Sequence, residues 1–368
     1  MRELAKIAKI QALRPIANKD RIELATVENY PVIVEKGAYV VGDLVIFCEY
    51  DTVLPVRPEF EFLRSRCWSK SYQGFRIKNM KLAGEYSSGI VFSLSILPES
   101  TRIKEGADVT TILGVQKYDV EELKERTAGT SKKRSRFMKW LLRYSFFRKL
   151  LLKKQVSKNY PSTIQKSDET NVQKLFNKYK ENYGNTVFYK TEKLEGQAVS
   201  YMLIGKKREY RVYSHNVMRD AKGTGNWETL GRELNIEKLL RKLNNNWCIQ
   251  GEICGTGIQG NIYGFTNKRL FVYKVTDVDT GEALNCADLT KFCSENELSA
   301  VPMLGTSVLL DSLEETLVHA DGWSTFQKNE CVIKREGVVW RSVVDQHIGF
   351  KAKSRKYAVE FEKKNATL

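Results

Sequence analysis

Short apolar runs alternate with turn residues through the first 118 residues. The runs PVIVEKGAYVVGDLVIFCEYDTVLP (31–55) and FRIKNMKLAGEYSSGIVFSL (75–94) have the composition of short strands. Gly42 and Gly89 interrupt them at predicted turns. Residues 1–118 are therefore predicted to form an all-β, OB-like barrel, a fold that commonly binds oligonucleotides but does not by itself establish a function.

Residues 119–160 follow a different pattern, because their apolar side chains recur at spacings of three and four. This spacing predicts an amphipathic helix with its apolar face at Phe137, Trp140, Leu141, Tyr144, Phe147 and Leu151. Residues 126–158 contain twelve Lys or Arg and no Asp or Glu. This basic connector could strap two domains together, bind nucleic acid or lie on an anionic membrane surface. Nucleic-acid contacts are expected at Lys132, Lys133, Arg134, Arg136, Lys139 and Arg143.

Residues 161–368 combine strand and helix patterns. Strands are predicted at 187–190, 198–204, 210–214, 248–252, 269–278, 337–341 and 348–353. Helices are predicted at 168–181, 226–245, 286–297 and 312–326. The mixture predicts an α+β domain built on antiparallel sheets.

The composition narrows the possible partners and locations. The net charge of +16 favours a polyanionic partner. The seven cysteines are scattered and form no CxxC pair, and the chain has only three histidines. No zinc site is therefore expected. No apolar run approaches the roughly 18 residues of a membrane helix, and the first residues lack the apolar core of a secretion signal. We expect a monomeric, cytoplasmic protein with reduced thiols and no transmembrane segment.

Several common catalytic motifs are absent from the sequence. There is no GxxxxGK[ST], no GxSxG and no HExxH. The segment FYKTEKLEGQAVSYML instead places Lys193 three residues before Gly196, between two predicted strands. Lys193 could be a nucleophile at a tight turn, where Gly196 lets the backbone approach a phosphate. Taken alone, the same string could also be an ordinary exposed turn.

Further segments with chemical potential follow Lys193 in order. The first is Ser214-His215-Asn216, and Gly251-Glu252 comes after it on a predicted strand. Glu336 then lies immediately before an apolar predicted strand. Lys351 and Lys353 lie two residues apart, so both point to one face of their strand.

This ordered set resembles the covalent nucleotidyltransferases, which are the polynucleotide ligases and mRNA capping enzymes. The matching segments are Lys193–Gly196, Ser214–Asn216, Gly251-Glu252, Phe271–Tyr273, Glu336–Val339 and Lys351–Lys353. TEKLEG, GEICGTGIQ and the N-terminal β-domain are most similar to ATP-dependent RNA ligases of the Deinococcus type. The resemblance covers nearly all of the chain except residues 126–158. It implies an ATP-grasp-like antiparallel α+β nucleotidyltransferase domain at 161–368.

The resemblance also implies a mechanism. Lys193 attacks the α-phosphate of ATP and carries AMP, which passes to a 5′-phosphate end before a 3′-hydroxyl seals the strand. The substrate would be RNA or an RNA/DNA duplex with a nick or juxtaposed ends. Lys351 and Lys353 would neutralise the α-phosphate. Glu252 and Glu336 would bind Mg²⁺ or Mn²⁺, although Glu252 could instead hold a ribose hydroxyl.

The same resemblance assigns the base-binding residues. Leu194, Gly196 and Asn216 are implied to contact the nucleotide. Glu192 would accept from the adenine amino group and so favour ATP over GTP. Tyr273 would stack on adenine, with Phe271 as the alternative, because both lie on one face of a predicted strand.

Three residues depart from the family pattern. Glu195 stands where many relatives have Asp or His, and Lys274 stands where an acidic residue is common. His215 stands where Arg is frequent, and Arg219 or Arg211 could replace that contact.

Two other functions remain open from the sequence. One is a DNA ligase or an mRNA-capping guanylyltransferase, which labelling with ATP against GTP would distinguish. The other is a non-catalytic nucleic-acid-binding protein that keeps an inactive transferase fold.

Overall fold

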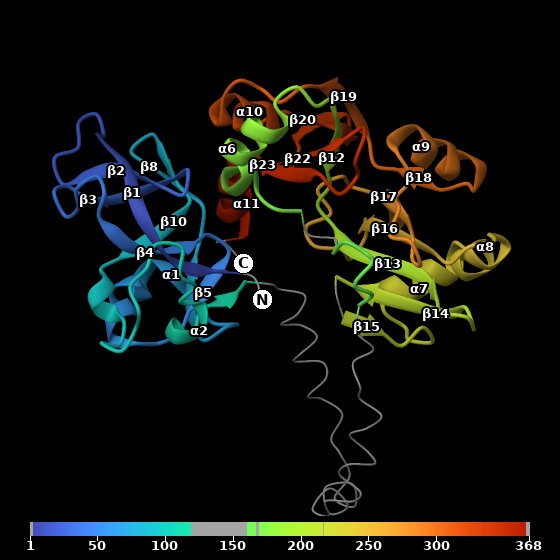
Figure 1. Ribbon diagram of the computed structural model, residues 1–368, viewed down its shortest axis with the longest axis horizontal. Coiled ribbons are helices and arrows are strands. Elements are labelled where there is room, and N and C mark those ends of the chain that lie inside the picture. Colours follow the sequence, from blue (N-terminus) through green and yellow to red (C-terminus); the bar gives the residue numbers. More distant parts are fainter. Residues whose placement is uncertain (1–2, 119–159, 167–168, 216, 366–368) are drawn as a thin grey trace, which may run out of the picture. The chain divides into compact units, whose positions relative to one another are not determined.

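The computed structural model describes residues 3–118, 160–166, 169–215 and 217–365. Figure 1 shows its helices and strands, coloured along the sequence. The chain divides into two compact units, one formed by Met1–Leu151 with Ala358–Leu368 and the other by Leu152–Tyr357. The last helix, α11 (Arg355–Asn365), spans this division.

The first unit is built from antiparallel strands and short helices. Its larger sheet has the order β10 (Gly89–Phe92), β4 (Leu44–Glu49), β1 (Ala5–Pro15), β2 (Ile22–Val27), β3 (Tyr30–Glu35). The smaller sheet has the order β11 (Gln116–Lys117), β5 (Thr52–Leu54), β7 (Gly74–Ile77), β6 (Trp68–Ser69). Strands β8 (Met80–Leu82) and β9 (Glu85–Ser87) form a hairpin. The short helices are η1 (Pro58–Leu63), α1 (Arg64–Cys67), η2 (Leu94–Ile96) and α2 (Thr110–Leu113).

The larger sheet curls into a nearly closed barrel. Strand β1 pairs with β4 through Ala5–Lys9 and with β2 through Ile10–Pro15, and its register shifts after Ile10. The far edge, β3, is tied to the chain beside β10, since the N–H of Ser88 donates to the carbonyl of Pro31 at 2.8 Å. Gly89 begins β10 at φ 152°, and a Cβ there would lie 2.5 Å from the Phe47 ring, so only glycine fits.

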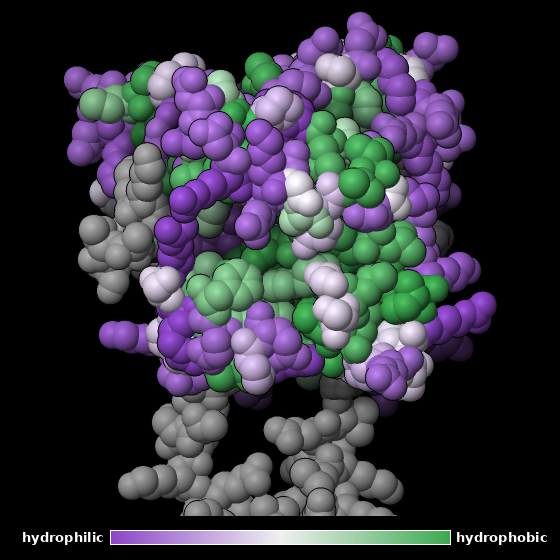
Figure 2. Space-filling model, turned by 90° about the vertical axis from the view of Figure 1, so that its left-hand side faces the viewer, coloured by the Kyte–Doolittle hydropathy of each residue, from purple (hydrophilic) through white to green (hydrophobic). Residues whose placement is uncertain are grey.

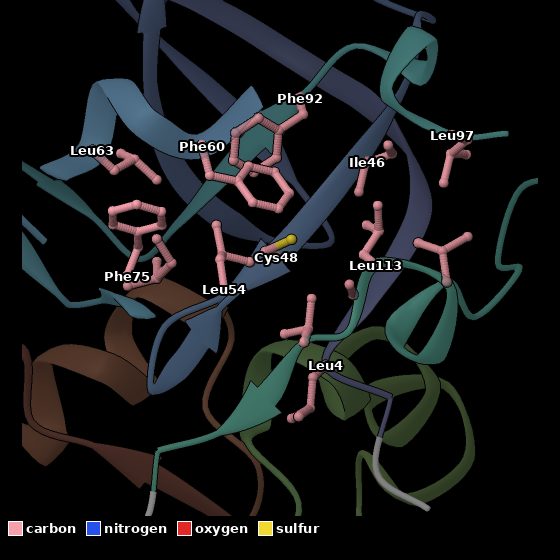
Figure 3. Packing of buried hydrophobic residues seen from close by; sticks show 14 of the residues in the cluster. Leu4, Ile46, Cys48, Leu54, Phe60, Leu63, Phe75, Phe92, Leu97 and Leu113 are labelled. Carbon is pink, nitrogen blue, oxygen red and sulfur yellow. The ribbon is translucent and has the colours of Figure 1, made fainter. Parts of the chain in front are cut away.

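Strand β4 is buried on both faces and therefore joins two hydrophobic clusters. Ile46 and Cys48 pack with Leu54 in one cluster, which Figure 3 shows between the two sheets and the short helices. Val45 and Phe47 point the other way and pack in the second cluster. Because successive side chains of a strand point to opposite faces, β4 contributes residues to both hydrophobic clusters of this unit.

The second unit contains two main antiparallel sheets. One has the order β19 (Met303–Ser307), β12 (Phe188–Lys193), β22 (Gly337–Ser342), β23 (Gly349–Lys353). The other has the order β15 (Val217–Arg219), β14 (Glu209–Ser214), β13 (Gln197–Ile204), β16 (Trp247–Cys254), β17 (Arg269–Asp277), β18 (Ser299–Ala300), in which only β17 and β18 are parallel. Strands β20 (Trp323–Lys328) and β21 (Cys331–Lys334) form a separate hairpin.

Helices cover the apolar faces of these sheets. The helices α6 (Val172–Tyr183) and α10 (Leu313–Ala320) pack on β12, β22 and β23, where the rings of Trp340 and Phe350 stack with centroids 5.2 Å apart. The helices α7 (Asn226–Glu233), α8 (Ile236–Lys242) and α9 (Cys286–Glu295) pack on the six-stranded sheet. These cores hold the strand ends that carry the candidate site.

Two predicted helices differ from the structure. The helix expected at 226–245 is two helices, because Asn235 between them adopts a left-handed conformation with φ 51°. The helix expected at 312–326 was wrong beyond Ala320, since Trp323–Lys328 forms β20. Trp323 and Phe326 have helical spacing, but Gly322 favours an end to the helix and the β-branched Thr325 favours a strand.

Apolar side chains also occur on the surface. On the face displayed in Figure 2 they gather in one area bordered by polar residues. The large apolar residues exposed in the first unit include Val40, Val41 and Phe62. Among the described helices, none combines the length and the apolar character required to cross a membrane.

Candidate active site

Lys193 is the last residue of β12 and lies beside β22. The two strands are antiparallel, with Lys193 opposite Gly337. The Nζ of Lys193 donates to Oε2 of Glu336 at 2.7 Å, and these side chains are 23% and 16% exposed. The lysine is therefore an accessible, ion-paired amine at a strand end.

Strand β23 brings two further lysines to the same sheet. Gly337 is opposite Lys353, and Val339 is opposite Lys351. Because directly opposed residues share a face, Lys193 and Lys353 lie on one face with Gly337 between them. The side chain of Lys351 is buried on this face, and its backbone N–H donates to the carbonyl of Thr170 at 2.9 Å.

Gly196 precedes β13 and lies close against the neighbouring strand β16. A Cβ at Gly196 would lie 2.4 Å from the Ile253 carbonyl oxygen and 2.7 Å from Cγ of Glu252, so this approach requires glycine. Glu252 is opposite Ala198 on the neighbouring strand. Gly196 thus allows the Glu252 carboxylate to lie beside the segment that carries Lys193. Leu194, by contrast, is buried in an aromatic cluster with Tyr263 and Phe271.

Glu195 is buried next to Lys193. Its backbone N–H donates to the Tyr263 hydroxyl at 2.8 Å. Burial, reinforced by the nearby charge of Glu336, raises the pKa of the Glu195 carboxyl to about 7, against the opposing effects of Tyr357, Gly260 and Lys193. The site therefore contains one carboxyl that holds a proton near neutral pH.

Tyr263 and Tyr357 were not among the residues singled out from the sequence. Tyr263 is 68 residues from Glu195 along the chain, and no motif or spacing connects them. The packing of the loop after β16 places the Tyr263 hydroxyl at the backbone N–H of Glu195, and the start of α11 places Tyr357 near its carboxyl.

Glu192 is almost completely buried, on the strand that ends with Lys193. Its Oε2 accepts two hydrogen bonds from Thr325 on β20, one from the backbone N–H at 2.8 Å and one from Oγ1 at 2.7 Å. The backbone N–H of Glu192 donates to the carbonyl of Pro302 at 2.9 Å. Thr325, which the sequence assigned to a helix, is thus the main partner of Glu192.

Phe271 and Tyr273 have different surroundings, which the sequence could not reveal. The register of β16 and β17 shifts, since Gln250 is opposite Lys274 but Gly251 is opposite Val272. Tyr273 is the extra residue of this β-bulge, a feature that re-aims side chains. Its ring is half-buried, with the Arg341 guanidinium 5.5 Å from the centroid.

Phe271 is instead enclosed by other rings. It is 4% exposed, and its ring centroid lies 5.3 Å from that of Phe326 and 5.8 Å from that of Phe265. Tyr273 therefore presents more accessible ring surface than Phe271.

Lys274, one of the three departures from the family pattern, is buried in the interior. Its Nζ donates to the carbonyl of Gln346 at 3.1 Å and also to the side chain of Gln165. Burial, followed by the charge of Arg341, lowers the pKa of Lys274 to about 8. Arg341 in turn forms a buried ion pair with Glu169, with nitrogen to oxygen distances of 3.0 and 3.1 Å.

The segment that contains His215 lies at the turn after β14. His215 has φ 52°, and its N–H donates to the carbonyl of Ala198 at 3.2 Å. Asn216 lies outside the described residues. Arg219 donates from Nε to Oγ of Ser214 at 2.7 Å and stacks on Trp227, and Arg211 pairs with Glu209 at 2.9 Å. Arg219 is therefore held beside the Ser214-His215 turn, whereas Arg211 pairs with a neighbouring side chain.

The predicted nucleic-acid residues also fall outside the described part of the chain. They are Lys132, Lys133, Arg134, Arg136, Lys139 and Arg143, within the basic segment 126–158. In the described ranges, no group of three or more His, Cys, Asp or Glu could hold a metal ion. A cation at this site would therefore depend on the two carboxylates of Glu252 and Glu336, water and a ligand, which suits Mg²⁺ because it keeps several waters.

Two family models match the chain. Residues 4–94 match the PHA02142 OB-fold domain, and residues 186–357 match RNA ligase. A comparison with curated protein sequences found no match.

Solved structures of an RNA ligase from Naegleria gruberi match the whole chain. An apo variant has a TM-score of 0.80 and 26% identity, covering 99% of both chains. The form with PPi has a TM-score of 0.80 and 26% identity, covering 100% of both chains. A variant with ATP and Mn has a TM-score of 0.80 and 26% identity, covering 98% of both chains.

These matches define the class of protein. The chain has an N-terminal OB-fold domain followed by an α+β nucleotidyltransferase domain, which confirms the predicted fold class. More particularly, residues 186–357 match the RNA ligase family model, and the whole chain is similar in structure to the Naegleria gruberi RNA ligase.

Proposed function

We propose that this protein is an ATP-dependent RNA ligase that carries AMP on Lys193. The observation that carries the proposal is the contact between Nζ of Lys193 and Oε2 of Glu336 at 2.7 Å, inside the domain that matches RNA ligase. The structural neighbours solved with ATP and Mn, or with PPi, support the same chemistry. The order of an OB-fold domain before the ligase domain supports assignment to the Deinococcus type.

The chemistry begins with the lysine amine. A protonated amine has no lone pair, so Lys193 must release a proton before it attacks. Oε2 of Glu336 is within hydrogen-bonding distance and is positioned to hold that proton. A bond then forms between Nζ and the α-phosphorus of ATP, the bond from that phosphorus to the β-phosphate oxygen breaks, and pyrophosphate leaves.

The neighbouring lysines and carboxylates have separate proposed roles, in neutralising phosphate charge and in binding a metal ion. Lys351 and Lys353 on β23 lie on the face of the sheet that also carries Lys193 on β12, and they would offset the charge on the α-phosphate. Glu252 and Glu336 would hold Mg²⁺ or Mn²⁺, which supplies further charge neutralisation when bound. Tyr273 would stack on adenine, and Leu194, Gly196 and Asn216 would line the nucleotide site.

The proposed substrate is RNA with juxtaposed 3′-hydroxyl and 5′-phosphate ends. AMP passes from Lys193 to the 5′-phosphate, forming a 5′–5′ pyrophosphate link. The 3′-hydroxyl then attacks the 5′-phosphate, and AMP leaves as the strand is joined. The charge of segment 126–158 supports a role in binding the polyanion.

The test is a sealing assay on nicked duplexes whose joined ends are RNA or DNA, with ATP or GTP. The proposal expects ATP-dependent sealing with an RNA 3′-hydroxyl, and accumulation of adenylylated 5′ ends when the 3′ end is blocked. Sealing of DNA alone would favour a DNA ligase. Labelling by GTP instead of ATP would favour a capping-type enzyme.

A further inference from the structure

The β20–β21 hairpin contacts the residue that precedes the proposed nucleophile. Thr325 directs its backbone N–H and its Oγ1 to the same oxygen of Glu192, at 2.8 and 2.7 Å. The two residues are 133 positions apart, and no other described element supplies a hydrogen bond to this carboxylate. Two donors on Oε2 fix the plane and the rotation of the carboxylate, because both must be satisfied at once.

The other oxygen of Glu192 has no such partner. Glu192 is 1% exposed, and its Oε1 has no hydrogen-bond partner among the described residues. A buried carboxylate oxygen without a donor is costly, and a ligand that donates a hydrogen bond would remove that cost. Thr325 thus occupies Oε2 of Glu192 and leaves Oε1 able to accept a hydrogen bond from a ligand.

The same hairpin also reaches the aromatic side chains near the site. Phe326, adjacent to Thr325, packs on Phe271 with ring centroids 5.3 Å apart and on Tyr263 at 5.4 Å. The hairpin thus contacts both the carboxylate of Glu192 and the aromatic cluster that contains Leu194. The β20–β21 hairpin therefore links the Glu192 carboxylate, which can bind the edge of a base, to the aromatic side chains packed around Leu194.

We propose that Thr325 is a positioning residue for base selection, which rests on the proposed lysyl-AMP activity. By holding Oε2, it directs Oε1 of Glu192 toward the 6-amino group of adenine. Guanine and hypoxanthine present a carbonyl oxygen at that position, which would face the carboxylate with two acceptors and no proton between them. Recognition of the amino group would therefore select adenine.

The experiment compares ATP with purine riboside triphosphate, which lacks only the 6-amino group. The rate and the KM of lysine labelling are measured for both nucleotides in the full-length wild type and in Thr325→Val. Wild type should prefer ATP by about tenfold or more, the usual penalty for a missing partner of a buried charged group. Thr325→Val should reduce that preference to about threefold or less.

Matched variants separate positioning from damage to the fold. Thr325→Ser retains a hydroxyl and should restore the preference for ATP. Ser324→Ala removes the neighbouring hydroxyl, which accepts from the N–H of Phe326 and not from Glu192, and should leave the preference unchanged. Thr325→Ala serves as the second variant if valine disturbs the hairpin, and Thr325 is exposed enough to tolerate either change.

Different failures point to different conclusions. An unchanged ATP preference in both Thr325→Val and Thr325→Ala overturns the role of Thr325, while leaving the ligase activity intact. Equal labelling of wild type by both nucleotides overturns base recognition by Glu192. If wild type takes no label from ATP, the proposed function itself fails and this inference fails with it.

Discussion

Nζ of Lys193 and Oε2 of Glu336 lie 2.7 Å apart although 143 residues separate them in the sequence. The pairing of β12 with β22 brings them together, since Lys193 is opposite Gly337 and Glu336 immediately precedes it. The ion pair positions the amine and supplies the atom that can hold its proton.

Replacing Glu336 by Gln keeps the shape of the side chain but removes its negative charge. We expect the rate of lysine adenylylation to fall by about 100-fold or more, because a positioned proton acceptor contributes roughly that factor. Single-turnover labelling with ATP measures it. The control is Glu209→Gln, which alters the surface ion pair with Arg211 in the same unit. Equal rates for Glu336→Gln and Glu209→Gln would contradict the role assigned to Glu336.

Gly196→Ala should damage both stability and activity. Its Cβ would lie 2.4 Å from the backbone oxygen of Ile253 and 2.7 Å from the Glu252 side chain, so the start of β13 must shift away from β16. Overpacking of this kind costs about 1–3 kcal/mol. Gly260→Ala is the matched control, because its nearest contact would be an ordinary 3.7 Å. Urea unfolding of the two variants measures the difference, and equal losses would refute the steric argument.

The buried pair of Arg341 and Glu169 should contribute far more to stability than a surface pair. Arg341→Met leaves the Glu169 carboxylate buried without its charge partner, which typically costs about 3–5 kcal/mol. The control is Arg241→Met, which breaks an exposed pair with Glu237 and should cost less than about 1 kcal/mol. Thermal unfolding distinguishes them. A small loss in Arg341→Met would mean that the interior relaxes around Glu169.

Glu195 should make the stability of the protein depend on pH. Its pKa rises from 4.5 to about 7 on folding, so the native state binds this proton more tightly than the unfolded chain does. The free energy of unfolding should therefore fall as the pH rises from about 4.5 to about 7, by about 2–4 kcal/mol, and change little from this source above that range. Glu195→Gln should remove this slope, as measured by urea unfolding between pH 5 and 8. Parallel pH profiles for wild type and variant would exclude Glu195 as the cause.

The strands that carry the site could be predicted from the sequence, but the β-bulge at Tyr273 and the contact made by Thr325 could not. The predicted strands 187–190, 337–341 and 348–353 located β12, β22 and β23 to within a few residues, and two-residue spacing placed Lys351 and Lys353 on one face. The bulge at Tyr273 was not predictable, because it depends on pairing with β16 rather than on the residues of β17. Thr325 was missed for a related reason, since its segment has helical apolar spacing but pairs as a strand in the folded chain.

The most direct measurement is the site of nucleotide attachment. The full-length protein is incubated with ATP and Mg²⁺, digested and examined by peptide mass spectrometry, alongside Lys193→Arg as a cationic control. The account predicts an AMP adduct on Lys193 in wild type, and no adduct on any lysine in Lys193→Arg. An adduct on another lysine, or its persistence in Lys193→Arg, would contradict the assignment of Lys193 as the nucleophile.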